Sequence, residues 1–327
     1  MTAPVPLVRV VRSGLQESVH VGDVAVCDAD GRVVAFAGDP HRALFSRSCM
    51  KPLQAAVSLT SMNSFYDLSD RQVAVMCASH NGEPVHVETV HSLLEWAGLG
   101  VDDLQCPPDF PLDQESAVAA GERRRDQHNC SGKHAGKLLA CVRAGWETSS
   151  YLYPMHPLQQ AILRGVTAGT GLEPAAVGVD GCGAPVHAVT LAGMATLFAR
   201  LTAPERLGEL ELAARRAVTA MLAQPYLVAG RNRVGTVLME ETGEVIEKGG
   251  AEGLSCSASL PAGLGIAVKT ADGSHRAIPP AVLSVLRQLG LVGDATLQAL
   301  SPFARPPVLG GGRPVGEIEA VVELQRA

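Results

Sequence analysis

The chain has 327 residues and a formal net charge of −6, and it is 46% hydrophobic but only 18% charged. A chain of this length and apolar content can bury a large core, so we expect a single folded unit over residues 1–327 and no long disordered segment. No basic run that would grip a phosphate backbone and no apolar stretch of about 18 residues is present, so we expect neither a nucleic-acid partner nor a membrane span.

The N-terminal segment and the cysteines indicate the cellular compartment of the protein. Arg9 and Arg12 interrupt the apolar residues near the N-terminus, where a secretory signal needs an unbroken apolar segment, so we expect a cytoplasmic protein. The eight cysteines are spread through the chain and are expected to be thiols or metal ligands instead of a disulfide framework. Only five of the 27 basic residues are lysines. Each lysine is of interest, because an amine can lose its proton and a guanidinium cannot.

The N-terminal half begins with strands and continues with helices. Val-rich segments at 6–14, 20–29 and 32–38 predict strands, and the turn residues at 28–31 favour a hairpin. Residues 52–62 predict a helix, and a helix-rich region follows to about residue 178. Within it, the apolar run 72–80 fits a buried helix or a buried strand, because periodicity alone does not separate them.

The C-terminal half predicts helices over 190–222, a β-hairpin over 233–250, a strand over 263–273, a helix over 279–290 and a strand over 316–327. Strands at both ends that enclose helices predict an α/β (α+β) fold with an antiparallel-rich sheet built from the N- and C-terminal segments. The sheet lobe would comprise residues 1–45 and 185–327, and the helix-rich lobe residues 46–184.

The strongest local motif is Ser48-Cys-Met-Lys51, directly before Pro52. Proline has no N–H, so a helix is expected to begin at this point. The i, i+3 spacing then places Ser48 and Lys51 on one face. A neutral Lys51 amine could take the hydroxyl proton of Ser48, which makes the serine a candidate nucleophile.

Two later motifs extend this interpretation. Ser79-His80-Asn81 and Lys269-Thr270-Ala271 follow in the order of the S-x-x-K, S-D-N and K-T-G elements of serine β-lactamases and penicillin-binding proteins, although each differs from its element at one position. Lys248-Gly249-Gly250 is a rival for the third element, because it also ends a strand. We favour Lys269, which is followed by threonine and preceded by the more apolar strand.

Cysteines and histidines form a second cluster. Cys130 and His134 are four residues apart and could share a helix face, and Cys182 could add a second thiolate, which would suit Zn²⁺. Arginines that could bind a substrate carboxylate are Arg231 and Arg233, interpreted as ordinary loop residues, and Arg47, which is favoured by its position beside Ser48.

Four motifs in order resemble the asparaginase II family, the rhizobial type of L-asparaginase. They are RSCMKP at 47–52, CASHNGE at 77–83, HNCSGKHAG at 128–136 and DGCGAP at 180–185. The resemblance covers nearly the whole chain. It implies a fold similar to those of glutaminases and serine β-lactamases, two Ser–Lys pairs beside a zinc ion, a small-molecule substrate and a homodimer.

By this resemblance, Ser48 is the expected nucleophile with Lys51 as its base, and Ser79 and Lys269 are the expected second pair. The resemblance implies that the metal ligands are Cys130, Lys133 and Cys182. Residues expected to contact the substrate or its surroundings are Arg47, Asn81, Asp180 and His134.

The implied activity is hydrolysis of the side-chain amide of L-asparagine to L-aspartate and ammonia through an acyl ester on Ser48. Three alternatives stay open at this point. They are a related Ser–Lys enzyme (a glutaminase or a penicillin-recognising enzyme), a self-cleaving threonine amidohydrolase at Gly235-Thr236, and a zinc-binding structural or sensor protein.

Overall fold

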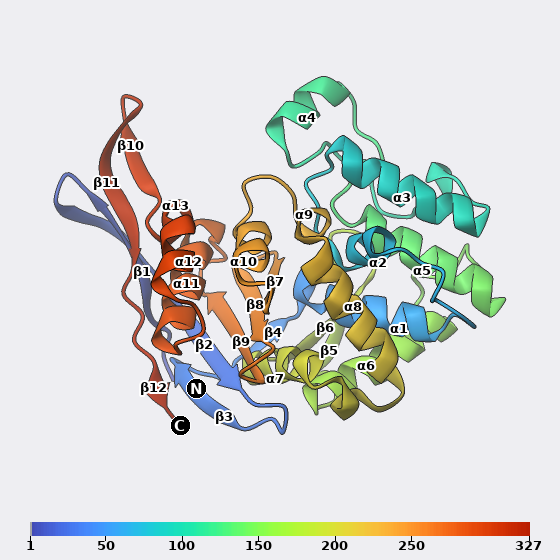
Figure 1. The fold of residues 1–327 in the computed structure, drawn as a ribbon, viewed down its shortest axis with the longest axis horizontal. Coiled ribbons are helices and arrows are strands. Elements are labelled where there is room, and N and C mark those ends of the chain that lie inside the picture. The colour runs from blue at the N-terminus through green and yellow to red at the C-terminus, as the bar shows by residue number, and fades with distance from the viewer. Residues whose placement is uncertain (1) are drawn as a thin grey trace.

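A computed structural model of the chain describes residues 2–327 and shows, within them, a nine-stranded sheet on one side of the molecule and most of the helices on the other (Figure 1). The strand order is β10-β11-β1-β2-β9-β8-β7, with β3 paired to β2 and β12 paired to β3. These strands are β1 (Val5–Arg12), β2 (Leu15–Cys27), β3 (Val33–Ala37), β7 (Val245–Gly250), β8 (Leu254–Ser259), β9 (Leu264–Thr270), β10 (Pro307–Gly310), β11 (Arg313–Ala320) and β12 (Gln325–Arg326).

The two ends of the chain lie side by side in this sheet. Strand β1 pairs antiparallel with β11 in the register Val10↔Ile318, and the remaining pairs of the sheet are antiparallel as well. The prediction of a mixed α/β fold with an antiparallel-rich sheet joining the N- and C-terminal segments is therefore confirmed.

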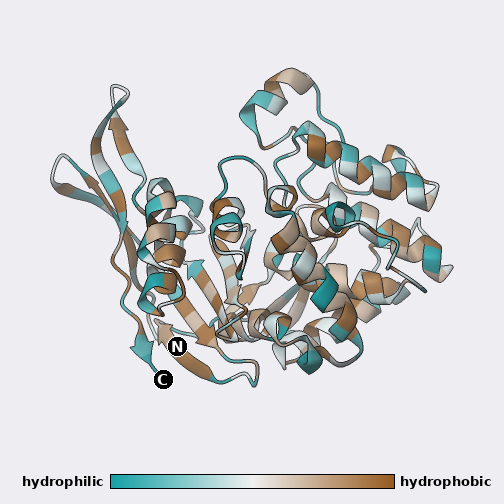
Figure 2. Ribbon diagram, in the orientation of Figure 1, coloured by the Kyte–Doolittle hydropathy of each residue, from teal (hydrophilic) through white to brown (hydrophobic). Residues whose placement is uncertain are grey.

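Both faces of the central strands are buried. Val24 and Val26 of β2 belong to a core under helix α11 (Ile278–Gln288). The alternate residues Ala25 and Cys27 belong to a core that reaches helix α7 (Leu191–Thr202) and the other helices. A strand covered on both faces reads as a continuous apolar run instead of an alternation. The apolar centre of the sheet is visible in Figure 2.

The helices are α1 (Lys51–Thr60), α2 (Asp70–Cys77), α3 (Pro84–Ala97), α4 (Gln114–Ala120), α5 (Ser131–Ala144), α6 (Pro157–Thr170), α7 (Leu191–Thr202), α8 (Glu211–Ala223), α9 (Pro225–Val228), α10 (Val234–Thr242), α11 (Ile278–Gln288), α12 (Asp294–Ala299) and α13 (Ser301–Ala304). Four 3-10 turns accompany them: η1 (Arg47–Met50), η2 (Val101–Asp103), η3 (Pro204–Leu210) and η4 (His275–Ala277). A second sheet has the order β4 (Ala43–Phe45), β6 (Pro185–Thr190) and β5 (Ala176–Val179).

Close helix packing positions the residues near the site. Helix α5 runs against α2 at Gly132, where a Cβ atom would lie 2.2 Å from the backbone oxygen of Val75. Only glycine permits this approach. It brings the start of α5 next to the end of α2. Helix α8, from residues 211–223, also packs against α1 and α2.

The structure decides one expectation that the sequence left open and corrects another. The run at 72–80 is mostly helix α2, which begins with a capping box between Ser69 and Gln72. The hairpin expected over 233–250 is wrong in its first half, because residues 234–242 form helix α10. Val234, Val237 and Leu238 have the i, i+3, i+4 spacing of a helix and pack together against the sheet core.

No helix among residues 2–327 has the combination of length and apolar character that crossing a bilayer requires.

Candidate active site

Ser48 lies in the 3-10 turn η1, immediately before helix α1. Pro52 stands in the first turn of α1, where the missing N–H is harmless, so the helix begins at the predicted place. Arg47 has a φ of 43°, a conformation that residues other than glycine rarely adopt. Backbone strain of this kind is concentrated at functional sites, and here it directly precedes the candidate nucleophile.

Ser79 is held by backbone hydrogen bonds after the end of α2. Its N–H donates to the backbone oxygen of Val228 at 3.0 Å, and the N–H of Asn81 donates to that of Ala229 at 2.8 Å. The segment around Ser79 therefore lies against the chain that follows α9.

Two buried lysines contact the Ser79 hydroxyl. The Nζ of Lys51 lies 2.9 Å from Ser79 Oγ, and the Nζ of Lys248 lies 2.8 Å from the same atom. Lys51 also donates to the backbone oxygens of Ala78 at 2.6 Å and Asn129 at 3.3 Å. The row Lys51–Ser79–Lys248 is thus continuous, and a proton can pass along it.

The lysine beside Ser79 is Lys248, which corrects the expectation that it is Lys269. Lys248 lies on β7, the edge strand next to η1, where its backbone oxygen accepts a hydrogen bond from Cys49 Sγ at 3.0 Å. Lys269 lies on β9, two strands further into the sheet, and its Nζ donates to the backbone oxygen of Thr270. The apolar strand that favoured Lys269 reflects a central place in the sheet, not proximity to the site.

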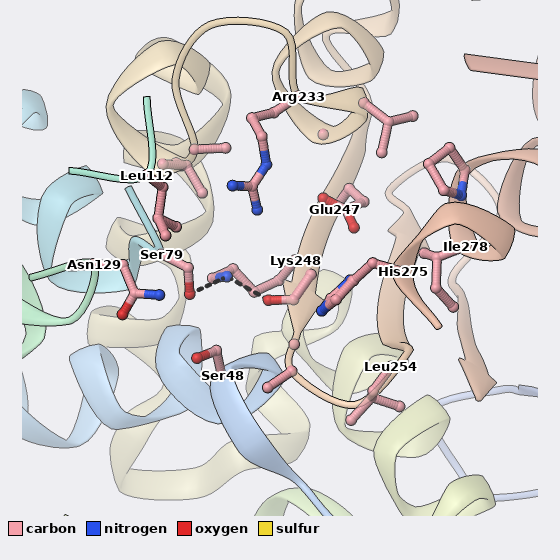
Figure 3. Close-up of a pocket in the computed structure, with 18 of the residues that line it drawn as sticks. Ser48, Ser79, Leu112, Asn129, Arg233, Glu247, Lys248, Leu254, His275 and Ile278 are labelled. Carbon is pink, nitrogen blue, oxygen red and sulfur yellow. Dashed lines mark hydrogen bonds between the residues drawn. The ribbon is translucent and has the colours of Figure 1, made fainter. Parts of the chain in front are cut away.

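A cavity of about 520 Å³ opens beside this row. Ser48 and Ser79 both line it (Figure 3). Other residues on its wall are Asn129, Arg233, Glu247, Lys248, His275, Leu112, Ile278 and Phe303. The Lys51 amine bonds to Ser79, and no hydrogen bond joins it to Ser48 in the part of the chain that the structure describes. A substrate in the cavity would contact both serines.

The lysines of the row hold their protons weakly. Burial lowers the pKa of Lys51. Burial and then the charge of Lys51 lower the pKa of Lys248 to about 7. Because the amine of an unperturbed lysine titrates near pH 10.4, these environments make a neutral amine available near neutral pH. A neutral amine within reach of a serine hydroxyl is the requirement for a general base.

Thiols and a third lysine form a separate buried cluster. Cys130 precedes helix α5, Lys133 lies in its first turn, and Cys182 lies in the turn between β5 and β6. The Nζ of Lys133 donates to Cys182 Sγ at 2.9 Å. A hydrogen bond to Cys182 and burial raise the pKa of Cys130, whereas the hydrogen bond from Cys130 and the charge of Lys133 lower the pKa of Cys182.

The donor set of this cluster fits a zinc ion. No three side chains drawn from His, Cys, Asp and Glu are arranged to hold a metal in residues 2–327, and the expected set includes a lysine instead. Cys130, Lys133 and Cys182 offer two buried sulfurs and one nitrogen, which are the donor types that Zn²⁺ prefers. His134 Nε2 is a further buried nitrogen with no hydrogen-bond partner in the described chain.

The four side chains expected near the substrate have other contacts. Arg47 Nε donates to Asp180 Oδ1 at 2.9 Å, which ties η1 to the turn that carries Cys182. His134 Nδ1 lies 2.6 Å from the hydroxyl of Tyr151. Asn81 bonds to the chain at 231–233. None of the four is on the cavity wall described above, and their contact with substrate stays a prediction.

Two charged residues of the cavity were not predicted as site residues: Arg233 was interpreted as an ordinary loop residue, and Glu247 was not singled out. Arg233 lines the cavity, whereas its near neighbour Arg231 points to the outer surface and pairs with Glu115 at 2.6 Å. Glu247 lies next to Lys248 on β7 and is only 5% exposed. Two consecutive charged residues inside the apolar strand VIEKGG were the signal for this wall of the site.

The chain is similar to known proteins in sequence and in fold. The sequence model described as L-asparaginase II matches residues 8–320. No curated protein matches the chain. Similar solved structures include a β-lactamase (Mb2281c) from Mycobacterium bovis, 20% identical over 82% of this chain and 94% of that chain with a TM-score of 0.43. Another is the Bacillus subtilis glutaminase YbgJ in covalent complex with 5-oxo-L-norleucine, 13% identical over 83% and 88% with a TM-score of 0.37.

Proposed function

From the premise that this chain belongs to the L-asparaginase II family and is an amidohydrolase, we propose that it hydrolyses the side-chain amide of L-asparagine to L-aspartate and ammonia. The observation that carries the proposal is the row Lys51–Ser79–Lys248 at the wall of a cavity that also exposes Ser48. It supplies a nucleophile, bases of lowered pKa and room for a small amide at one place.

Ser48 is the proposed nucleophile. Its oxygen attacks the amide carbon while its proton passes to a neutral amine of the row, and backbone N–H groups near the start of α1 stabilise the oxyanion. The amide nitrogen then takes a proton from the row and leaves as ammonia, which gives a β-aspartyl ester on Ser48. Water attacks the ester, gives its proton to the same row, and releases aspartate.

We also propose that Cys130, Lys133 and Cys182 hold Zn²⁺ in the working enzyme. The ion would add a positive charge and fix the start of α5 to the β5–β6 turn. Metal analysis should find about one zinc per chain in the wild type and little in Cys182→Ser. Cys141→Ser is the matched control, because this free thiol on α5 is buried outside the cluster. Equal zinc in all three proteins would contradict the proposal.

The structure argues against the self-cleaving alternative. The Gly235–Thr236 bond lies inside helix α10, and Thr236 is buried with its hydroxyl bonded to the backbone oxygen of Gly230 at 2.8 Å. Cleavage there would have to break a formed helix. A single band of 34.1 kDa on a denaturing gel is therefore expected.

Ammonia release from L-asparagine and from L-glutamine tests the activity, with the ring opening of a β-lactam, followed by absorbance, as the substrate control. We expect asparagine to be hydrolysed fastest. A pocket distinguishes one methylene by only about 1–3 kcal/mol, so glutamine turnover at a lower rate is compatible with the proposal. Glutamine hydrolysis faster than asparagine hydrolysis, or opening of the β-lactam with no ammonia from either amide, would contradict it. The homodimer and the cytoplasmic location stay predictions.

A further inference from the structure

The cavity contains two opposite charges, Arg233 and Glu247, that form no direct ion pair within residues 2–327. Arg233 forms no ion pair with a carboxylate among residues 2–327, and its only side-chain hydrogen bond there goes from Nη1 to Asn81 Oδ1 at 3.1 Å. Glu247 likewise lacks an ion pair in that range and accepts a hydrogen bond from Ser255 Oγ at 2.5 Å. Both line the same cavity, and in Figure 3 both face its interior on the side away from Ser48.

Such charges are costly without a partner. Burial lowers the pKa of Arg233 and raises the pKa of Glu247, so in both cases the surroundings disfavour the charged form. A buried charge is tolerated mainly where an opposite charge lies beside it and offsets the cost of removing it from water. The two side chains attract each other only weakly, because no nitrogen of Arg233 lies within ion-pair distance of Glu247, and burial outweighs this attraction at both groups. The arrangement therefore fits a ligand that brings one negative and one positive group.

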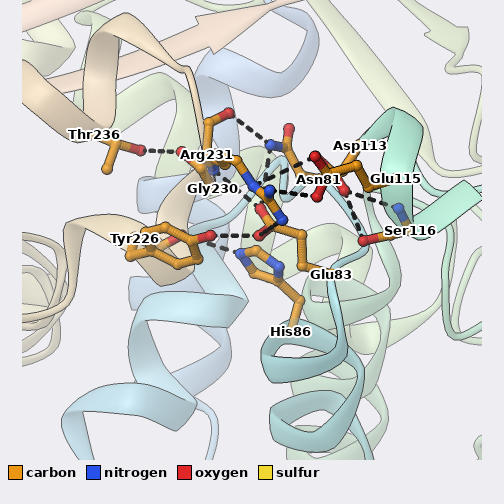
Figure 4. Close-up of polar contacts among 10 residues, drawn as sticks. All are labelled: Asn81, Glu83, His86, Asp113, Glu115, Ser116, Tyr226, Gly230, Arg231 and Thr236. Atoms are coloured by element: carbon orange, nitrogen blue, oxygen red, sulfur yellow. Dashed lines mark hydrogen bonds and ion pairs between the residues drawn. The ribbon is translucent and has the colours of Figure 1, made fainter.

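The loop that carries Arg233 is held in place by a polar network (Figure 4). Glu83 accepts hydrogen bonds from the N–H of Arg231 at 3.0 Å, from Asn81 Nδ2 at 3.3 Å and from the hydroxyl of Tyr226. Gly230 has a φ of 114°, and a Cβ there would lie 2.5 Å from Glu83 Oε1. The loop is thus fitted closely to Glu83. The Arg231 side chain is paired with the carboxylates of Glu83 and Glu115, and Arg233 lies on the cavity wall.

We propose that Arg233 binds the α-carboxylate and Glu247 the α-ammonium group of the substrate, so that the site takes free L-α-amino-acid amides. This inference rests on the proposed function. The other arginine near the nucleophile, Arg47, is already paired with Asp180. A peptide-linked asparagine has lost at least one of the two charges and would leave a buried charge unpaired, so it should be a poor substrate.

Two truncated substrates separate the two contacts. Succinamate keeps the carboxylate and the amide of asparagine but has no ammonium group, and β-alaninamide keeps the amine and the amide but has no carboxylate. We expect Arg233→Gln to lower kcat/KM for asparagine and succinamate about 100-fold and to leave β-alaninamide nearly unchanged. Glu247→Gln should lower kcat/KM for asparagine and β-alaninamide to a similar extent and leave succinamate nearly unchanged.

Two further variants control for structural effects. Arg231→Gln changes an arginine of the same loop that lies outside the cavity, so it should affect all three substrates by one small common factor. Arg233→Lys retains the charge and should recover part of the asparagine activity. Equal losses for all three substrates in Arg233→Gln, with thermal unfolding unchanged, would overturn the inference.

A binding measurement keeps this test separate from the test of activity. Calorimetry should show that L-aspartate binds the wild type and binds Arg233→Gln and Glu247→Gln at least 10-fold more weakly. If the wild type releases no ammonia from any amide, the proposed function fails. If it hydrolyses asparagine but the variants bind aspartate as tightly as the wild type, the assignment of Arg233 and Glu247 fails.

Discussion

Buried lysines occur in two clusters, Lys51 and Lys248 around Ser79 and Lys133 among the thiols at the start of α5, and burial is followed by opposite pKa shifts in the two. In the first, Lys51 and Lys248 both contact the Ser79 hydroxyl and backbone oxygens, and the charge of Lys51 acts on Lys248. The thiol of Cys130 also acts to raise the pKa of Lys51, but burial outweighs it. In the second, Lys133 faces the thiols of Cys182 and Cys130. Burial favours the neutral amine in all three.

The neighbours decide the result. The pKa of Lys248 falls to about 7, because burial is reinforced by the charge of Lys51. Burial also acts to lower the pKa of Lys133, but the charges of Cys182 and Cys130 outweigh it and raise the pKa. Lys248, next to the charge of another amine, becomes available as a base, whereas Lys133, between two thiols, keeps its proton and pairs with sulfur. Lys133 would have to release that proton to bind a metal. Buried lysines are therefore interpreted from their neighbours.

The largest expected effect on turnover comes from removing the hydroxyl of Ser48, the proposed nucleophile beside the first cluster. Ser48→Ala should lower asparagine turnover by about 10⁴-fold or more, because no acyl ester can form. The matched control is Ser46→Ala, which removes a buried hydroxyl with no hydrogen-bond partner in the described chain and should keep full activity. Steady-state ammonia release measures both. Turnover that survives in Ser48→Ala would move the nucleophile to Ser79.

Two matched variants test whether Lys248 or Lys269 is the lysine that acts together with Ser79. Lys248→Met removes the amine that contacts Ser79 and should lower kcat by about 10²–10⁴-fold, the usual contribution of a positioned acid or base. Lys269→Met removes the amine that was expected from sequence and should change kcat by less than about threefold, since it reaches only the oxygen of Thr270. The reverse pattern would restore Lys269 to the site.

A third kind of buried lysine, whose amine has no hydrogen-bond partner in the described chain, sharpens the comparison. Lys137 lies one turn after Lys133, is fully buried, and its Nζ has no hydrogen-bond partner in the described chain. Burial lowers its pKa to about 7. The pKa of Lys137 in the folded protein lies below its unfolded value near 10.4. As the pH falls from about 10 to about 7, the unfolded chain takes up a proton that the buried amine does not, so the free energy of unfolding decreases.

Replacing this amine should stabilise the protein. Lys137→Met should increase the free energy of unfolding at pH 7 by about 2 kcal/mol or more, and by much less at pH 10. Urea unfolding at the two pH values measures the difference. A variant that is less stable than the wild type at pH 7 would show that the Lys137 amine has a stabilising partner.

The most gradual effect is the pH dependence of the first cluster, which reaches only about tenfold at one pH unit below the pKa. Its amine must be neutral to accept a proton, so kcat/KM for asparagine should fall about tenfold per pH unit below the pKa of Lys248, which is about 7, and level off above it. A pH–rate profile between pH 5 and 9 measures this limb. A rate that stays constant down to pH 5 would exclude the lysine row as the base.

Local spacing predicted where some of the candidate residues lie along the chain. Ser48 and Lys51 lie one turn apart at the start of α1, and Cys130 and Lys133 one turn apart at the start of α5, as their spacing indicated. The antiparallel sheet that joins both chain ends also followed from the Val-rich segments at the termini.

Long-range contacts explain what could not be predicted. The choice between Lys248 and Lys269 depends on which strand forms the edge of the sheet next to η1, and strand order is not encoded in local patterns. The opposite directions of Arg231 and Arg233 depend on Glu83, which lies almost 150 residues earlier in the chain.

The most direct test of the central claim, that Ser48 forms the acyl ester, is to trap it. Incubation with a diazo-ketone analogue of asparagine, followed by peptide mass spectrometry, should attach the analogue, less dinitrogen, to the peptide that contains Ser48, and Ser48→Ala should remain unmodified. A stable adduct on Ser79, in the wild type or in Ser48→Ala, would contradict the account.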